Sequence, residues 1–151
     1  MKEIKKYFTH KNFGGYSDCI YGSDLKTQWW KGATIPNCVG AAWGFFNLDR
    51  GTGKNFRRLY GDAGSLYAKG CKDGSGFLCG YEPKNSSIAV YGAGTKAGHV
   101  TYVFHVFGNG QAIVLESNYS GTMSNGRGLR VKFGNPKTMY KEYRGCIYDF
   151  T

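Results

Sequence analysis

The stretch IPNCVGAAWGFF, residues 35–46, places a cysteine at the start of a predicted helix. Asn37 is a favourable N-cap residue, because its side chain can accept a hydrogen bond from a backbone N–H of the first helical turn. The apolar side chains that follow have the spacing of one helical face: Val39, Ala42, Trp43 and Phe46. With Gly51 as an end signal, the sequence predicts a helix that begins near Cys38 and packs one face on a core.

From residue 87 onward the apolar residues alternate, and β-branched and aromatic runs are separated by Gly, Asn and Pro. This pattern indicates short antiparallel strands. The runs are SIAVYG at 87–92, HVTYVFHVF at 99–107, QAIVLESNY at 111–119, LRVKFG at 129–134 and CIYDF at 146–150. A second helix fits within residues 56–70, where glycines weaken the pattern. Helices first and strands afterwards indicate an α+β domain.

Cys38 at a helix N-terminus would lie in a field of partial positive charge, which favours the thiolate, the reactive form of cysteine. A nucleophilic thiolate also needs a nearby base, which is usually a histidine. The chain contains three histidines: His10, His99 and His105. The pairing of the strands that carry residues 99 and 105 therefore bears on which histidine can serve Cys38.

The Asn-Gly step at 109–110 is a strong hairpin signal. A two-residue turn there would place Val103 opposite Glu116. Cross-strand partners share a face, and so do alternate residues of one strand, so His99, Glu116 and Asn118 would point the same way near the open end of the hairpin. Either polar side chain could accept the imidazole N–H and fix its tautomer.

The hairpin register and the role of His99 each have an alternative. A three-residue loop would shift the register by one residue and place His99 and Glu116 on opposite faces. His99 taken alone also fits a hydrogen-bonded histidine at the start of a strand. His105 shares the predicted face but lies toward the closed end of the hairpin. Glu116 ends an apolar strand, and a carboxylate in such a place indicates a role or a partner.

The composition indicates one globular domain with an anionic partner. The chain has 151 residues, 24 of them glycine, and a net charge of +10. Such a charge attracts nucleic acid, anionic lipid or an anionic wall polymer. No apolar run reaches the roughly 18 residues of a membrane span. The N-terminal segment MKEIKKYFTH lacks the apolar stretch of a signal peptide, so we expect a chain made without one or expressed as a fragment.

Five cysteines leave an odd one under any pairing: Cys19, Cys38, Cys71, Cys79 and Cys146. The loop KDGSGFL between Cys71 and Cys79 could be closed by a disulfide in an oxidising environment. A zinc site at that pair is disfavoured, because neither a CxxC step nor a nearby histidine accompanies it.

Three motifs, in order, resemble the CHAP family, the cysteine, histidine-dependent amidohydrolases/peptidases that cut bacterial peptidoglycan. They are NCVGAAWG at 37–44, GHVTYV at 98–103 and VLESN at 114–118. Two further segments, GDAGSLY at 61–67 and SSIAVYG at 86–92, are also similar to family segments. The resemblance covers roughly residues 35–150.

The resemblance implies that Cys38 is the nucleophile, His99 the general base and Glu116 the group that orients His99. Asn118 would be an additional polar group at the same site. The implied fold is papain-like, with the cysteine helix packed on a small antiparallel sheet that carries the histidine. We therefore expect a single catalytic domain over residues 1–151. Residues 1–34 would form an N-terminal arm, and residues 35–150 the catalytic core.

Some members of the family bind calcium through an Asp-rich loop just before the cysteine. Here the preceding segment WWKGATIP at 29–36 has no carboxylate, and Asp18 and Asp24 show no ligand spacing. We therefore expect neither a metal nor another cofactor.

The implied activity is hydrolysis of an amide bond in peptidoglycan. An N-acetylmuramoyl-L-alanine amidase is slightly favoured over an endopeptidase, and cell-wall lysis is the expected role, of the phage endolysin or bacterial hydrolase type. Anionic wall polymers would attract the basic chain. A separate wall-binding domain or subunit is an expected partner, whereas nucleic acid and membranes are not. The expected place of action is the bacterial cell wall, reached in the phage type by release from the host cytoplasm.

Two other functions compete with this one. A papain-like cysteine peptidase or acyltransferase acting on protein would use the same residues. A non-catalytic nucleic-acid-binding module would use the 20 Lys and Arg residues together with the many Tyr and Phe side chains. Against the second, the basic residues are scattered and form no dense stripe.

Overall fold

The computed structural model describes residues 19–21, 34–52, 57–117 and 129–151. Helices come before most of the strands, as the sequence predicts. In chain order the elements are β1 (Cys19–Tyr21), β2 (Thr34–Pro36), α3 (Cys38–Asp49), the 3-10 turn η4 (Ala63–Ser65), α4 (Leu66–Gly70), β3 (Phe77–Gly80), β4 (Ser87–Tyr91), β5 (His99–Val106), β6 (Ala112–Ser117), β7 (Leu129–Gly134), α5 (Pro136–Met139) and β8 (Tyr143–Phe150).

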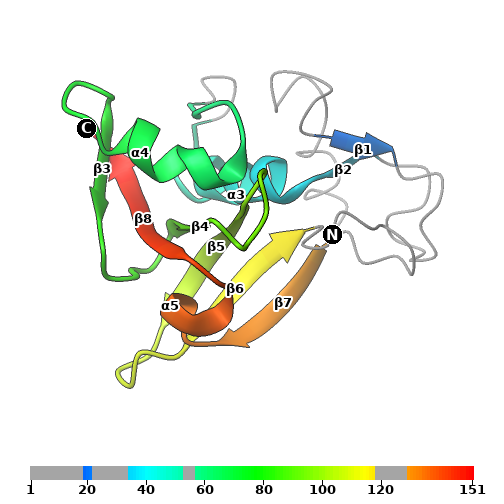
Figure 1. The fold of residues 1–151 in the computed structure, drawn as a ribbon, viewed down its shortest axis with the longest axis vertical. Coiled ribbons are helices and arrows are strands. Elements are labelled where there is room, and N and C mark those ends of the chain that lie inside the picture. Colours follow the sequence, from blue (N-terminus) through cyan, green and yellow to red (C-terminus); the bar gives the residue numbers. More distant parts are fainter. Residues whose placement is uncertain (1–18, 22–33, 53–56, 118–128) are drawn as a thin grey trace.

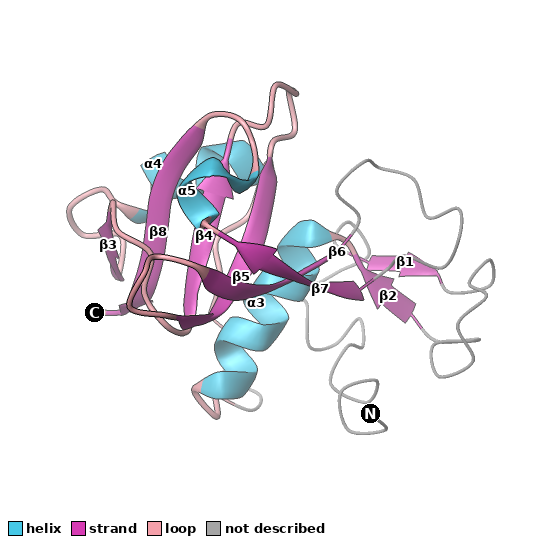
Figure 2. Ribbon diagram, turned by 90° about the horizontal axis from the view of Figure 1, so that it is seen from below, coloured by secondary structure: helices cyan, strands magenta, loops and turns pink. Residues whose placement is uncertain are grey.

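Six strands form one antiparallel sheet in the order β3-β8-β4-β5-β6-β7. Strands β8, β4 and β5 run side by side through its middle (Figure 2). Strands β1 and β2 pair separately, just before the helix that carries Cys38. The α+β class and the packing of the cysteine helix on an antiparallel sheet are therefore confirmed.

Helix α3 begins as the sequence predicts. The Asn37 side chain accepts a hydrogen bond from the Gly40 N–H at 2.9 Å, which makes Cys38 the first helical residue. The four apolar residues of the predicted face are all buried: Val39, Ala42, Trp43 and Phe46. They pack against one face of the sheet, where Ile88, Val90 and Val100 complete the main core.

The opposite face of the sheet carries a second cluster. Residues of β4 alternate between the two faces, so Ile88 and Val90 face α3, whereas Ala89 and Tyr91 belong to the second cluster. The short helix α5 contributes Met139 to that cluster and lies on the side away from α3 (Figure 1). The sheet is thus covered on both faces.

Arg50, the C-cap residue of α3, fastens the end of the helix to the sheet. Its guanidinium donates hydrogen bonds to the carbonyl oxygens of Phe46, Ser86 and Tyr148 at 2.9, 2.7 and 2.5 Å. It also donates to the Asp149 carboxylate at 2.8 Å, and this bond holds the pKa of that carboxyl below its ordinary value. The two ends of α3 are therefore both fixed by specific polar contacts.

The hairpin between β5 and β6 differs from the predicted one. Its loop has three residues, 108–110, because Phe107 N–H donates to the Gln111 carbonyl at 2.8 Å. The Asn109 side chain accepts from the Gln111 N–H at 3.0 Å, and Gly110 has a φ of +81°. An Asn side chain that bonds two residues ahead, followed by a left-handed glycine, favours this longer loop over a two-residue turn. The expected turn is therefore wrong.

A β-bulge on β5 compensates for the longer loop. His105 pairs with Ile113, but Val103 pairs with Val114, so Phe104 is an extra residue on its strand. Val103 is consequently not opposite Glu116, as the two-residue turn would have placed it. The loop shifts the register by one residue and the bulge shifts it by one more. Because side chains alternate with a period of two, His99 and Glu116 still share a face.

The second predicted helix is shorter than the range 56–70 within which it was expected. The chain is without helix over residues 57–62, then turns through η4 into α4. Gly61 has a φ of +113°, a conformation that an α-helix cannot contain. Cys71 follows α4 directly and forms a disulfide with Cys79 on β3, the pairing that the sequence left possible.

Removing this disulfide should destabilise the domain. Replacing Cys71 and Cys79 together by serine should lower the free energy of unfolding by about 2–3 kcal/mol, the chain-entropy value for closing so short a loop. Urea titration under non-reducing conditions measures the difference. A reductant should lower the stability of the parent and leave the double variant unchanged; equal stabilities of the two proteins without reductant would contradict the expectation.

Candidate active site

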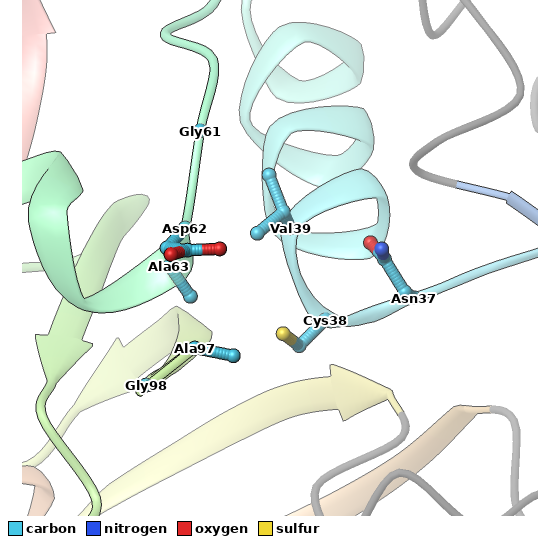
Figure 3. Close-up of a pocket in the computed structure, with 8 residues that line it drawn as sticks. All are labelled: Asn37, Cys38, Val39, Gly61, Asp62, Ala63, Ala97 and Gly98. Carbon is cyan, nitrogen blue, oxygen red and sulfur yellow. The ribbon is translucent and has the colours of Figure 1, made fainter. Parts of the chain in front are cut away.

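A pocket opens at the N-terminus of α3, and three separate segments of the chain line it. They are the start of α3, the segment that enters η4, and the turn before β5 (Figure 3). The lining residues are Asn37, Cys38, Val39, Gly61, Asp62, Ala63, Ala97 and Gly98. The Cys38 sulfur is directed across the pocket toward Ala63 and Ala97. Among these eight residues, Asp62 carries the one carboxylate.

Cys38 is held at the positive end of the α3 dipole. The Asn37 cap satisfies the Gly40 N–H, and the Asn37 carbonyl accepts from Ala41 N–H at 2.9 Å, so the first turn is well formed. A negative charge on a side chain of the first helical residue is favoured there. The side chain of Cys38 is partly exposed, which gives a ligand in the pocket access to the sulfur.

His99 is the first residue of β5 and follows Gly98 of the pocket wall directly. It is 1% exposed, and its Nε2 lies 2.9 Å from Oε2 of Glu116, whose side chain has no exposed surface. The structure thus brings together His99 and Glu116, as predicted, and Gly98, the residue before His99, lines the same pocket as Cys38. A buried carboxylate fixes the imidazole to which it bonds in one orientation.

The other candidates of the sequence fall elsewhere. Asn118 and His10 lie outside the described residues. His105 is exposed near the hairpin loop, and its ring packs edge-on against Phe107 with centroids 4.7 Å apart. His105 therefore belongs to the far end of the hairpin from His99.

Tyr140 is a site residue that the sequence analysis missed. Its hydroxyl donates to the Glu116 carboxylate, with distances of 2.5 Å to Oε1 and 2.7 Å to Oε2. Its ring packs edge-on against His99, with centroids 4.8 Å apart. The Asn-Pro step at 135–136 is a helix-start signal that announces α5, the element preceding Tyr140. No local pattern joins that element to Glu116.

Tyr91 of β4 is a second tyrosine beside the imidazole. Its ring is roughly parallel to that of His99, with centroids 6.5 Å apart and an interplanar angle of 28°. The Tyr91 hydroxyl donates to the Pro136 carbonyl at 2.6 Å, and burial raises the pKa of this phenol, so it remains protonated. Tyr91 therefore ties the start of α5 to the strand beside His99.

The backbone of Gly64 in η4 lies in close contact with the backbone of Gly98, the residue before His99. A Cβ on Gly98 would lie 2.4 Å from the Gly64 nitrogen, and Gly98 has a φ of +71°. The Gly64 N–H donates to the Ala97 carbonyl at 3.0 Å, and Arg144 donates to the Gly64 carbonyl at 2.6 Å. Only glycine meets both the conformation and the close approach at position 98. The segment that contains Gly64 and the turn that contains Gly98 are therefore held in contact directly before His99.

Over the described ranges, no group of three or more His, Cys, Asp or Glu side chains is arranged to hold a metal ion. In the same part of the chain, no helix is long and apolar enough to cross a membrane.

Residues 27–118 match the family model described as the CHAP domain. Among solved structures, a protein titled Ly7917 is similar, with a TM-score of 0.50 and 17% identity over 97% of this chain and 61% of that one. An N-acetylmuramoyl-L-alanine amidase from Staphylococcus aureus has a TM-score of 0.49 and 18% identity over 72% and 30%. The chain thus spans about three fifths of the length of Ly7917. No curated protein matches the sequence.

The close contact between Gly98 and Gly64 predicts that a larger residue at position 98 destabilises the domain. Gly98→Ala should lower the free energy of unfolding by about 3 kcal/mol or more, because the methyl group meets the Gly64 backbone. Gly110→Ala is the matched control, since Gly110 also has a positive φ but would meet nothing within 4 Å. The control should cost only about 1 kcal/mol, from the left-handed conformation alone. Urea titration of both variants compares them, and equal costs would contradict the contact.

Cys38 and Cys146 should differ in reactivity. Burial raises the pKa of the Cys146 thiol, which belongs to the second cluster on β8, whereas Cys38 faces the pocket at a helix N-terminus. Because the thiolate is the reacting form, iodoacetamide at pH 7 should modify Cys38 and leave Cys146 unmodified until the protein unfolds. Peptide mass spectrometry reports the modified residue. Modification of Cys146 at the rate of Cys38 in the native protein would contradict this expectation.

Proposed function

The chain belongs to the CHAP family, and we propose that it is a cysteine-dependent hydrolase that cleaves an amide bond of bacterial peptidoglycan. The observation that carries the proposal is the buried hydrogen bond between His99 and Glu116, next to a pocket that Cys38 lines. A thiol at a helix start, a histidine and a carboxylate that orients it are the parts that acyl transfer requires.

The reaction we propose begins with attack of the Cys38 thiolate on the amide carbonyl. With Nε2 of His99 donating to Glu116, Nδ1 is the nitrogen that exchanges a proton at the reaction centre. The imidazolium then gives that proton to the departing amine, which leaves a thioester on Cys38. Water attacks the thioester as His99 takes its proton, and the acid product is released with the thiolate restored.

Glu116 stabilises the positive charge that His99 carries between these steps. The pair is nearly excluded from water, which strengthens its electrostatic interaction. The backbone N–H of Cys38, at the positive end of α3, would stabilise the oxyanion of each tetrahedral intermediate. Asn118 follows Glu116 by two residues, and we propose it as an additional polar group of the site.

The choice of scissile bond is a finer proposal. The same residues would attack the bond between muramic acid and L-alanine, as an amidase, or a bond within the peptide, as an endopeptidase. We place the amidase reaction first. The net charge of +10 would concentrate the chain on polyanionic walls, where we propose that it acts in lysis. A separate wall-binding domain or subunit would add specificity for the target cell.

Lysis of purified Gram-positive cell walls tests this function. Cys38→Ala should lose activity by a factor of about 1,000 or more, since removal of the nucleophile leaves only binding and polar stabilisation. Cys146→Ala, which removes a buried thiol from strand β8, is the matched control and should keep activity near that of the parent.

Mass spectrometry of the released fragments identifies the bond. New L-alanine amines indicate an amidase, and other new termini indicate an endopeptidase. A folded Cys38→Ala variant that cleared walls as well as the parent would overturn the proposed nucleophile. Cleavage of a protein such as casein, with intact walls left untouched, would instead favour a protein peptidase.

A further inference from the structure

A chain of hydrogen bonds leads from Glu116 through Tyr140 to Lys132. We propose that Tyr140, supported by Lys132, is a positioning residue that holds the Glu116 carboxylate against His99 during catalysis. This inference rests on the proposed function, because it assigns a role within the same site. Neither Tyr140 nor Lys132 lines the pocket, so both would act through Glu116.

The Glu116 carboxylate needs strong donors because its side chain has no exposed surface. A buried carboxylate is stable only when its oxygens accept hydrogen bonds. His99 bonds to Oε2, and the Tyr140 hydroxyl lies within 2.5–2.7 Å of both oxygens. Bonds this short to a charged acceptor belong to the strong class. The hydroxyl thus restrains the rotation of the carboxylate about the bond that joins it to the rest of the Glu116 side chain.

Lys132 determines which way the Tyr140 hydroxyl points. Its ammonium group lies 3.0 Å from the hydroxyl oxygen, and an ammonium group can only donate. The tyrosine oxygen therefore accepts from Lys132 and must direct its own hydrogen to Glu116. Lys132 also brings a positive charge toward the buried carboxylate, and its Nζ lies 4.4 Å from the centre of the tyrosine ring. The order of donation is Lys132 to Tyr140 to Glu116.

Tyr140 also fixes the plane of the imidazole. The edge-on contact between the two rings restrains His99, and the Tyr140 ring also packs against Tyr91 with centroids 5.3 Å apart. One residue therefore restrains both members of the catalytic pair. Its backbone is extended and directly follows α5, whose first turn is capped by Asn135. Tyr140 thus comes from an element separate from the two strands that carry His99 and Glu116.

The experiment compares Tyr140→Phe with the parent. Phenylalanine keeps the ring against His99 and removes only the hydroxyl. We expect kcat to fall about 10-fold with KM unchanged, because the hydroxyl touches no substrate. Lys132→Met should lower kcat by a smaller factor, about three-fold, because it leaves the hydroxyl in place. Tyr148→Phe is the matched control, since its hydroxyl donates to the Glu82 carbonyl instead, and it should keep the parent kcat.

A double-mutant cycle separates positioning from general support of the fold. In a Glu116→Gln background, Tyr140→Phe should change kcat by less than about two-fold, because the group through which Tyr140 acts has already been altered. The same 10-fold loss in both backgrounds would overturn the proposal. So would a Tyr140→Phe variant with the parent kcat, or one in which only KM changes.

The alkylation rate of Cys38 provides a readout that does not depend on the substrate. Iodoacetamide reacts with the thiolate that His99 helps to form, so the rate should fall in Tyr140→Phe and stay at the parent value in Tyr148→Phe. If the parent does not cleave peptidoglycan but this difference is found, the proposed substrate is wrong and the role of Tyr140 stands. If the parent cleaves peptidoglycan and alkylation is unchanged in Tyr140→Phe, the role of Tyr140 is wrong.

Discussion

The site depends on keeping one carboxylate out of water. Glu116 has no exposed side-chain surface, and such a group is tolerated only when other parts of the protein supply donors to it. Those donors come from β5, which carries His99, and from the segment after α5, which carries Tyr140. The need to satisfy Glu116 therefore links the strand that borders the pocket to an element on the opposite face of the sheet from α3.

The parts of the fold that rest on local signals could be predicted from the sequence. The Asn37 cap and the apolar spacing after it give the helix and place Cys38 at its first position. The alternating runs after residue 87 give five of the six strands of the main sheet. The pairing of His99 with Glu116 was also expected, but through the wrong register. The prediction succeeded because the longer loop and the bulge at Phe104 each shift the register by one residue. A total shift of two residues leaves each side chain on its predicted face of the sheet.

The contacts between distant segments of the chain could not be predicted from the sequence. The bond from Tyr140 to Glu116 spans 24 residues and joins β6 to a segment that belongs to no strand. The approach of Gly98 to Gly64 has a visible glycine on each side, yet glycines are so frequent in this chain that neither stands out. Asn118 and most of the N-terminal arm lie outside the described residues, so their predicted places stay predictions.

The hairpin that joins β5 to β6 has a consequence for how this domain can change over evolution. Loss of one residue from the 108–110 loop would leave Phe107 opposite Gln111 across a two-residue turn, so Glu116 would stay on the face of His99. Loss of the bulged residue would likewise leave Val103 opposite Val114 and would make the alternation along β5 regular. Length changes at this end of the hairpin therefore leave His99 and Glu116 on one face, and related sequences should vary there in loop length and bulge independently. The strand that carries His99 can in this way hold an irregularity near its far end without disturbing the position of its first residue.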